Sequence, residues 1–95
     1  MSPDVIVTKK NCIIVFHIKY PNGSIDTDYK IEGTSAIVTA TIVPNIVEIP
    51  QRYFTAHAIG PFENKLEDGL EKIELQAVYR CLYLMGIITF EALTA

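Results

Sequence analysis

The two histidines, His17 and His57, are the side chains of this 95-residue chain best suited to acid–base or ligand chemistry. Each lies in a stretch of β-branched and aromatic residues. If these stretches are neighbouring strands, alternation can bring both imidazoles to one face, with Tyr53 and Thr55 beside His57. Such a group could bind an anion, a metal or a small ligand, and the alternative is two unrelated, half-exposed histidines on a β surface. No third ligand from Asp, Glu or Cys accompanies them, so we predict no metal site and no cofactor.

The other reactive residue types form no catalytic constellation. Cys12 falls in a strand pattern and Cys81 on a helix face, without a CxxC motif, so we predict two reduced core thiols. The sequence has neither a nucleophile elbow nor a glycine-rich phosphate loop. Carboxylates crowd one stretch, at Glu67, Asp68, Glu71 and Glu74. We interpret them as the solvated face of a helix, and we expect a protein that is not an enzyme.

Composition and charge narrow the classes of partner. Hydrophobic residues make up 49% and charged residues 20% of the chain, which is typical of one globular domain. The net charge of −3 disfavours nucleic acid and anionic membranes as partners. No apolar run reaches the roughly 18 residues of a membrane span, and the first residues lack the features of a secretory signal. We therefore expect a cytoplasmic protein.

Alternation and turn residues predict an antiparallel sheet of four to five strands over residues 1–60. Pro21-Asn22-Gly23 reads as a hairpin turn, and Glu32-Gly33-Thr34 and Pro44-Asn45 as further breaks. The expected strands are 12–20, 24–31, 35–43 and 52–59, with an edge strand at Val5-Ile6-Val7 and an extended linker over 46–49.

A single long helix is predicted over residues 62–86, followed by a tail over 87–95. Apolar residues recur every three or four positions and define a stripe that should face the sheet. The stripe consists of Leu66, Leu70, Ile73, Ala77, Cys81 and Leu84. Gly86 is placed to end the helix. The tail residues Ile87-Ile88-Thr89-Phe90 are β-prone and could pair as an extra strand.

The last turns of this helix are apolar almost all round, and one sheet cannot cover every side. Tyr79, Leu82, Tyr83 and Met85 lie away from the sheet-facing stripe. We interpret them as a contact between copies of the chain, most simply a dimer. The competing interpretation is that the tail folds back over them within one chain.

Two resemblances bear on function. Glu74-Leu75-x-Ala77, preceded by three strands, resembles the first helix of ribonuclease H-like domains, which carries a catalytic Glu, and Asn22-Gly23-Ser24 stands where that family has Asp-Gly-Ser. The resemblance implies nucleic-acid processing, but Asn22 is not a carboxylate and two-metal hydrolysis needs several. The strand-to-helix order is also similar to double-stranded-RNA-binding domains, whose helix begins with basic residues where this chain is acidic.

Together these features predict an α+β domain with an antiparallel sheet and one long C-terminal helix. The favoured function is a non-catalytic interaction or assembly domain that homo-oligomerises through its helix and presents a sheet surface to a protein partner. The alternative is a nucleic-acid-binding or nucleic-acid-processing protein with a reduced ribonuclease H-like fold.

Overall fold

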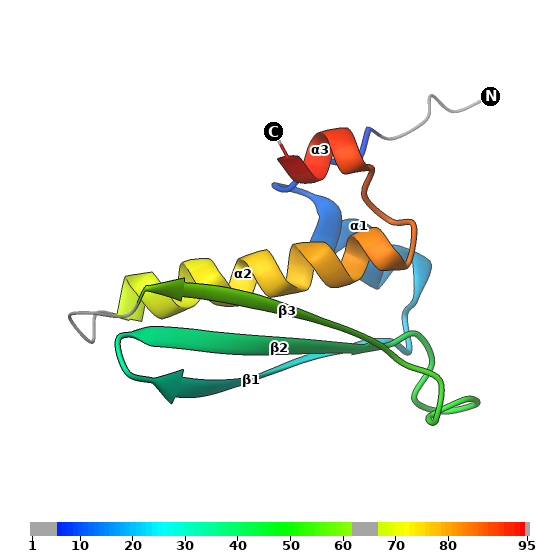
Figure 1. Ribbon diagram of the computed structural model, residues 1–95. Coiled ribbons are helices and arrows are strands. Elements are labelled where there is room, and N and C mark those ends of the chain that lie inside the picture. The colour runs from blue at the N-terminus through cyan, green and yellow to red at the C-terminus, as the bar shows by residue number, and fades with distance from the viewer. Residues whose placement is uncertain (1–5, 62–66, 95) are drawn as a thin grey trace.

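The computed structural model describes residues 6–61 and 67–94 and has the predicted α+β class. Its elements are α1 (Cys12–Lys19), β1 (Ser24–Glu32), β2 (Ser35–Val43), β3 (Phe54–Pro61), α2 (Glu67–Leu84) and α3 (Phe90–Thr94). The strands form one antiparallel sheet in the order β1-β2-β3, and α2 lies across one face of it (Figure 1). The described residues contain three strands, fewer than the four to five predicted, because two segments expected to extend the sheet do not.

The β1–β2 hairpin matches the sequence-based prediction closely. Glu32 pairs with Ser35 around the two-residue turn Gly33-Thr34, and Gly33 has a positive φ of 61°, which glycine adopts without steric cost. The strands run over 24–32 and 35–43, within one residue of the predicted ranges. The third strand begins at Phe54, two residues later than expected.

The prediction of a strand over 12–20 was wrong, because this segment forms helix α1. Its β-branched residues favour a strand locally, but Cys12 and Phe16, four positions apart, are both fully buried on one helical face. A turn starts the helix, with the Cys12 N–H donating to the Thr8 carbonyl at 2.9 Å. Tertiary packing of the buried face thus overrides propensity. Pro21-Asn22-Gly23 consequently joins a helix to a strand and is not a hairpin turn.

Two smaller predictions in the first 60 residues also differ from the structure. Ile6 and Val7 are not in a strand, and Val5 lies outside the described residues. Residues 46–49 form turns, because the Asn45 side-chain oxygen accepts hydrogen bonds from the N–H groups of Val47 at 3.1 Å and Glu48 at 3.0 Å. Such local side-chain bonding competes with an extended backbone.

Helix α2 lies within the single helix predicted over 62–86, whose first residues, 62–66, lie outside the described ones. The described residues also contain α1 and the short C-terminal helix α3, which the prediction lacked. Ile73, Ala77 and Cys81 are buried against the sheet, as the stripe predicted. Leu84 is not, because 57% of its surface is exposed. At this end of the helix the buried leucine is Leu82, which lies beside α1 and the tail and not on the sheet-facing stripe.

A tight glycine turn ends α2. The Ile87 N–H donates to the Leu82 carbonyl and the Gly86 N–H to the Tyr83 carbonyl, both at 3.0 Å, while Gly86 has a φ of 81°. These are the two hydrogen bonds of a Schellman motif. The chain then reverses, buries Ile87 and Ile88, and forms α3 instead of the extra strand that seemed possible.

Alanine substitutions at two glycines should have opposite effects. Gly86→Ala should lower the free energy of unfolding by about 1–2 kcal/mol, because the side chain is strained at positive φ. Gly69→Ala should raise it by about 0.5–1 kcal/mol, because Gly69 is helical and an added Cβ there meets no atom within 4 Å. Chemical denaturation measures both, and equal signs would contradict the assigned end of α2.

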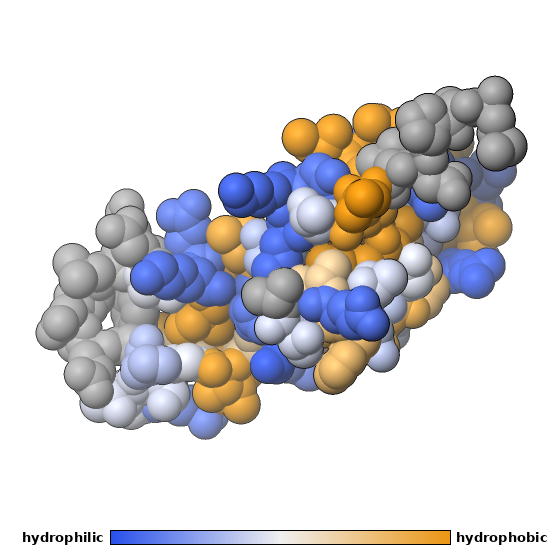
Figure 2. Space-filling model, turned by 90° about the horizontal axis from the view of Figure 1, so that it is seen from above, coloured by the Kyte–Doolittle hydropathy of each residue, from blue (hydrophilic) through white to orange (hydrophobic). Residues whose placement is uncertain are grey.

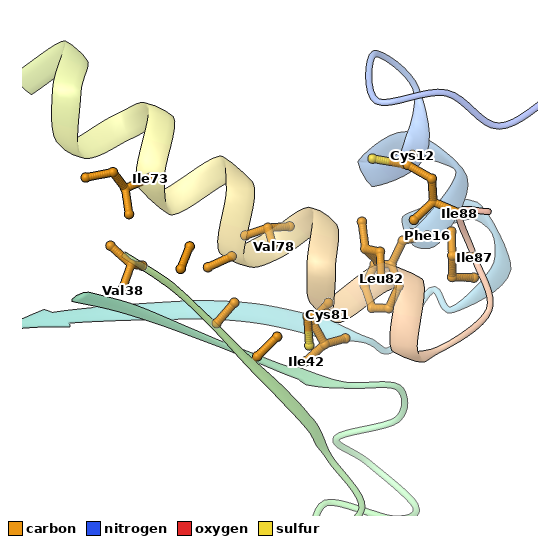
Figure 3. Close-up of a cluster of buried hydrophobic side chains, with 14 of the residues drawn as sticks. Cys12, Phe16, Val38, Ile42, Ile73, Val78, Cys81, Leu82, Ile87 and Ile88 are labelled. Atoms are coloured by element: carbon orange, nitrogen blue, oxygen red, sulfur yellow. The ribbon is translucent and has the colours of Figure 1, made fainter. Parts of the chain in front are cut away.

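The hydrophobic core has two connected parts (Figure 3). Between α2 and the sheet, Val38 and Ile42 of β2 meet the buried face of α2. At the end of α2, Leu82 lies beside Phe16 of α1 and Ile88 of the tail. We call Phe16, Leu82 and Ile88 the end cluster. All three side chains are 2% exposed or less, so α1 and the tail together close the core that one sheet leaves open.

Candidate functional site

The two faces of the sheet have different characters. Along β2, alternate residues from Ala36 to Ile42 are buried under α2, while Thr39 and Thr41 point to the opposite, open face. The register places Asp28 opposite Thr39 and Asp26 opposite Thr41 on that open face. The open face is therefore a largely polar surface, and no element of the described residues covers it.

His57 and Thr55 share this open face on β3. The His57 Nδ1 and the Thr39 Oγ1 are 2.9 Å apart, and the Thr41 and Thr55 hydroxyl oxygens are 3.4 Å apart. Thr55 also donates to the Ala40 carbonyl at 3.2 Å. Cross-strand hydrogen bonds of this kind stabilise the sheet. Tyr53 precedes β3 and is exposed.

His17 does not join them. A shared histidine face depended on reading 12–20 as a strand, whereas His17 lies on α1, on the helix side of the sheet. There it lines a cleft. The described residues thus hold two separate histidine environments, one on the open face and one between the helices.

The cleft around His17 lies between α1, α2 and β1 and has a volume of about 560 Å³. Its walls are mostly apolar, with four polar side chains among them. It is lined by Ile13, His17, Ile25, Thr27, Leu70, Glu71, Glu74, Leu75 and Val78. A second hollow continues from Thr27 and Glu74 to Tyr29. Together they follow the inner side of β1, which α2 covers only in part.

Two of the four polar side chains of this cleft are carboxylates, Glu71 and Glu74. The Thr27 hydroxyl donates to the Glu74 carboxylate, joining β1 to α2. Glu71 lies one turn earlier on the same helix. An apolar cleft with carboxylates suits a ligand or side chain that carries a positive charge. Sequence reasoning missed this cleft because one of its walls is α1, and the only sequence signal for that helix is the four-residue spacing of Cys12 and Phe16.

Both cysteines are buried and reduced, as predicted for core thiols. Burial raises the pKa of the Cys81 thiol to about 11, and its Sγ donates to the Phe54 carbonyl at 3.2 Å. Burial also raises the pKa of Cys12. A thiol that stays protonated at neutral pH is a poor nucleophile and a poor metal ligand.

Within residues 6–61 and 67–94, no three His, Cys, Asp or Glu side chains are grouped so as to hold a metal ion. Glu74, the residue on which the ribonuclease H-like resemblance rests, accepts a hydrogen bond from the Thr27 hydroxyl. Asn22-Gly23 precedes β1, whereas the family motif follows a strand. The described part of the chain therefore contains no cluster of carboxylates that could hold the metal ions of a nuclease.

The four residues expected at a contact between copies have different surroundings. Leu82 is fully buried within the single chain, in the end cluster, while Tyr79 and Met85 are half-buried. Tyr83 is exposed, and its ring lies 6.0 Å from that of Phe90 of α3. The tail thus covers Leu82, while Tyr83, Leu84 and Phe90 remain exposed apolar side chains at this end. We call these three residues the α2-end patch.

Comparison with known proteins gives no match: no family model, no curated protein and no solved structure matches this chain. Among the described residues, no helix combines the length and the apolar character needed to cross a membrane.

Proposed function

We propose that this chain is a small non-catalytic interaction and assembly domain. It associates with further copies of itself through the end of α2 and offers its sheet side to a protein partner. The observation that supports this most directly is the α2-end patch, in which Leu84 is 57% and Phe90 61% exposed.

The surface distribution of apolar residues supports self-association at this end. In Figure 2, which looks down on the helix side, orange residues gather toward the end where α1, α3 and the last turns of α2 meet. Exposed apolar side chains that cluster are typical of interaction surfaces, whereas scattered ones are normal on any protein. A symmetric dimer would let the patch cover its own copy.

The domain offers two places for a partner, one on each side of the sheet. The open face presents a row of threonines with His57, and the cleft presents carboxylates within apolar walls. The acidic charge of the cleft favours a partner that brings a lysine or arginine side chain.

The alternative function is nucleic-acid binding. The order β1-β2-β3-α2 is the strand-to-helix order behind the resemblance to double-stranded-RNA-binding domains. Such domains grip phosphate with basic side chains, whereas Glu71 and the net charge of −3 would repel it. Binding of a labelled RNA duplex that weakens steeply with added salt would favour this alternative over a protein-binding role.

The Leu84→Glu variant tests the assembly role. Leu84 is exposed, so the variant should fold, but its carboxylate should prevent the α2-end patch from covering itself. We expect the wild type to run as an oligomer at high micromolar concentration in light scattering coupled to size exclusion, and the variant to run smaller. Ile59→Glu is the matched control, because Ile59 is also apolar and mostly exposed but lies on β3, on the open face of the sheet. A monomeric wild type would refute the proposal.

A further inference from the structure

We propose that the outer edge of β1 pairs with β1 of a second copy of this chain, antiparallel and with Asp28 on the two-fold axis. The two three-stranded sheets would then form one continuous six-stranded sheet. This contact is separate from the α2-end patch and does not require it.

The first observation is that β1 is an incompletely covered edge strand. It lies at one edge of the sheet, and α2 packs mainly over β2 and β3. On its helix-facing side, Tyr29 is 58% exposed and Ile31 is also exposed. An edge strand with apolar side chains in the open is a template for pairing with another strand.

The other edge is less available. The Arg80 side chain of α2 donates to the His57 carbonyl of β3 at 2.9 Å. This hydrogen bond from the helix occupies one backbone carbonyl that a strand pairing with β3 would need. On β1 the hydrogen bond is made within the strand itself: the Asp28 carboxylate accepts from the N–H of the next residue, Tyr29, at 2.9 Å.

The second observation is that β1 is complementary to itself in one register. With Asp28 on the axis, the full strand Ser24–Glu32 overlaps its copy end to end. On the open face, Lys30 stands opposite Asp26 of the second copy, and the symmetry creates this pair twice. On the helix side, Ile31 stands opposite Ile25 and Tyr29 opposite Thr27. Opposite charges and β-branched or aromatic pairs are the cross-strand pairs that stabilise antiparallel sheets.

Neighbouring registers are worse. A shift of the pairing by one residue would turn the second sheet over, because successive side chains point to opposite faces. Only shifts by two residues keep both α2 helices on the same face of the joint sheet. A shift that centres Tyr29 places Asp28 opposite Lys30 twice, but it also places Asp26 opposite Glu32 twice. A shift that centres Thr27 places Asp26 opposite Asp28 twice. The chosen register has one like-charged pair, Asp28 with itself. Asp28 therefore limits the strength of the contact.

Pairing in this register would also bury the exposed inner side of β1. The side chains of Ile25, Tyr29 and Ile31 from both copies would lie side by side between the two α2 helices. The cleft of each copy would open into the same trough, with Glu71 and Glu74 on its walls. The partner site and the self-contact would thus be neighbours.

Charge reversal tests the contact and its register. In the Leu84→Glu background, where the α2-end patch is disabled, we expect a dimer in sedimentation equilibrium. Lys30→Glu and Asp26→Lys should each weaken it about tenfold or more, and the double variant should restore it, because the pair is rebuilt with its signs exchanged. Asp28→Asn should tighten it. Lys72→Glu on α2 makes the same charge change away from the edge and should leave it unchanged.

Cysteine cross-linking tests the axis directly. Only a residue on the axis meets its own copy at the 4.5–5.5 Å Cα separation of a strand pair, roughly the range that a disulfide spans. Asp28→Cys should therefore form a covalent dimer under mild oxidation, whereas Asp26→Cys and Lys30→Cys should not. The native thiols are buried and should not interfere.

Three results would overturn this proposal: a monomer in the Leu84→Glu background, a double reversal that fails to restore the dimer, or equal cross-linking at positions 26, 28 and 30. The assembly role through the α2-end patch is measured separately, by the effect of Leu84→Glu on the wild type. A negative result for one contact therefore leaves the test of the other contact unaffected.

Discussion

Phe16→Ala should lower the free energy of unfolding by about 3–5 kcal/mol, because it empties the centre of the end cluster. Phe16 is fully buried, its ring lies 5.4 Å from that of Tyr20, and an added Cβ at Gly23 would come within 2.6 Å of its ring. Neighbours packed this closely cannot collapse into the space. A loss of this size is a large fraction of the stability of a small domain.

Ile18→Ala is the matched control for that experiment. Ile18 lies on the same helix, two residues from Phe16, but is 73% exposed. Urea denaturation should give a change below about 0.5 kcal/mol for it. Equal effects of the two substitutions would mean that α1 is not packed on the end cluster.

Leu82→Ala should cost about 2–5 kcal/mol, and Leu84→Ala less than about 1 kcal/mol. The two leucines are two residues apart on α2, yet Leu82 is fully buried and Leu84 is mostly exposed. The substitutions remove the same atoms, so the difference reports burial alone. Thermal or chemical denaturation measures both.

The reverse ranking would restore the sheet-facing stripe as first predicted from the sequence, with Leu84 in it and Leu82 outside. It would also return Leu82 to the surface between copies. The pair of variants therefore decides which side of the last turns of α2 faces the core.

The sequence predicted correctly those elements in which the spacing of apolar residues and the turn or capping residues indicate the same structure. In β1 and β2, alternation and the Gly33 turn indicate the same hairpin, and in α2 the spacing of Ile73, Ala77 and Cys81 indicates one buried face. The end at Gly86 follows from the conformation that glycine alone adopts readily. Each of these signals is carried by residues close together in the chain.

The segment 12–20 could not be assigned in this way, because two signals in it conflict. Its β-branched residues indicate a strand, and the only helical signal is the four-residue spacing of Cys12 and Phe16. What decides between them is contact with Leu82 and Ile88, which lie far along the chain. The candidate site could not be predicted for the same reason. His17 lines the cleft only because residues 12–19 form a helix and not a strand.

The end cluster joins segments that lie almost at opposite ends of the chain, Phe16 on one side and Leu82 with Ile88 on the other. The β1–β2 hairpin closes over two residues, whereas this cluster must close a loop of most of the chain, which costs more entropy before any contact forms. The hairpin should thus belong to the early phase of folding and the end cluster to the late one. Removing the first helix or the last ten residues should then have the same consequence, a chain whose sheet still forms but whose unfolding is faster because its closing contact is gone.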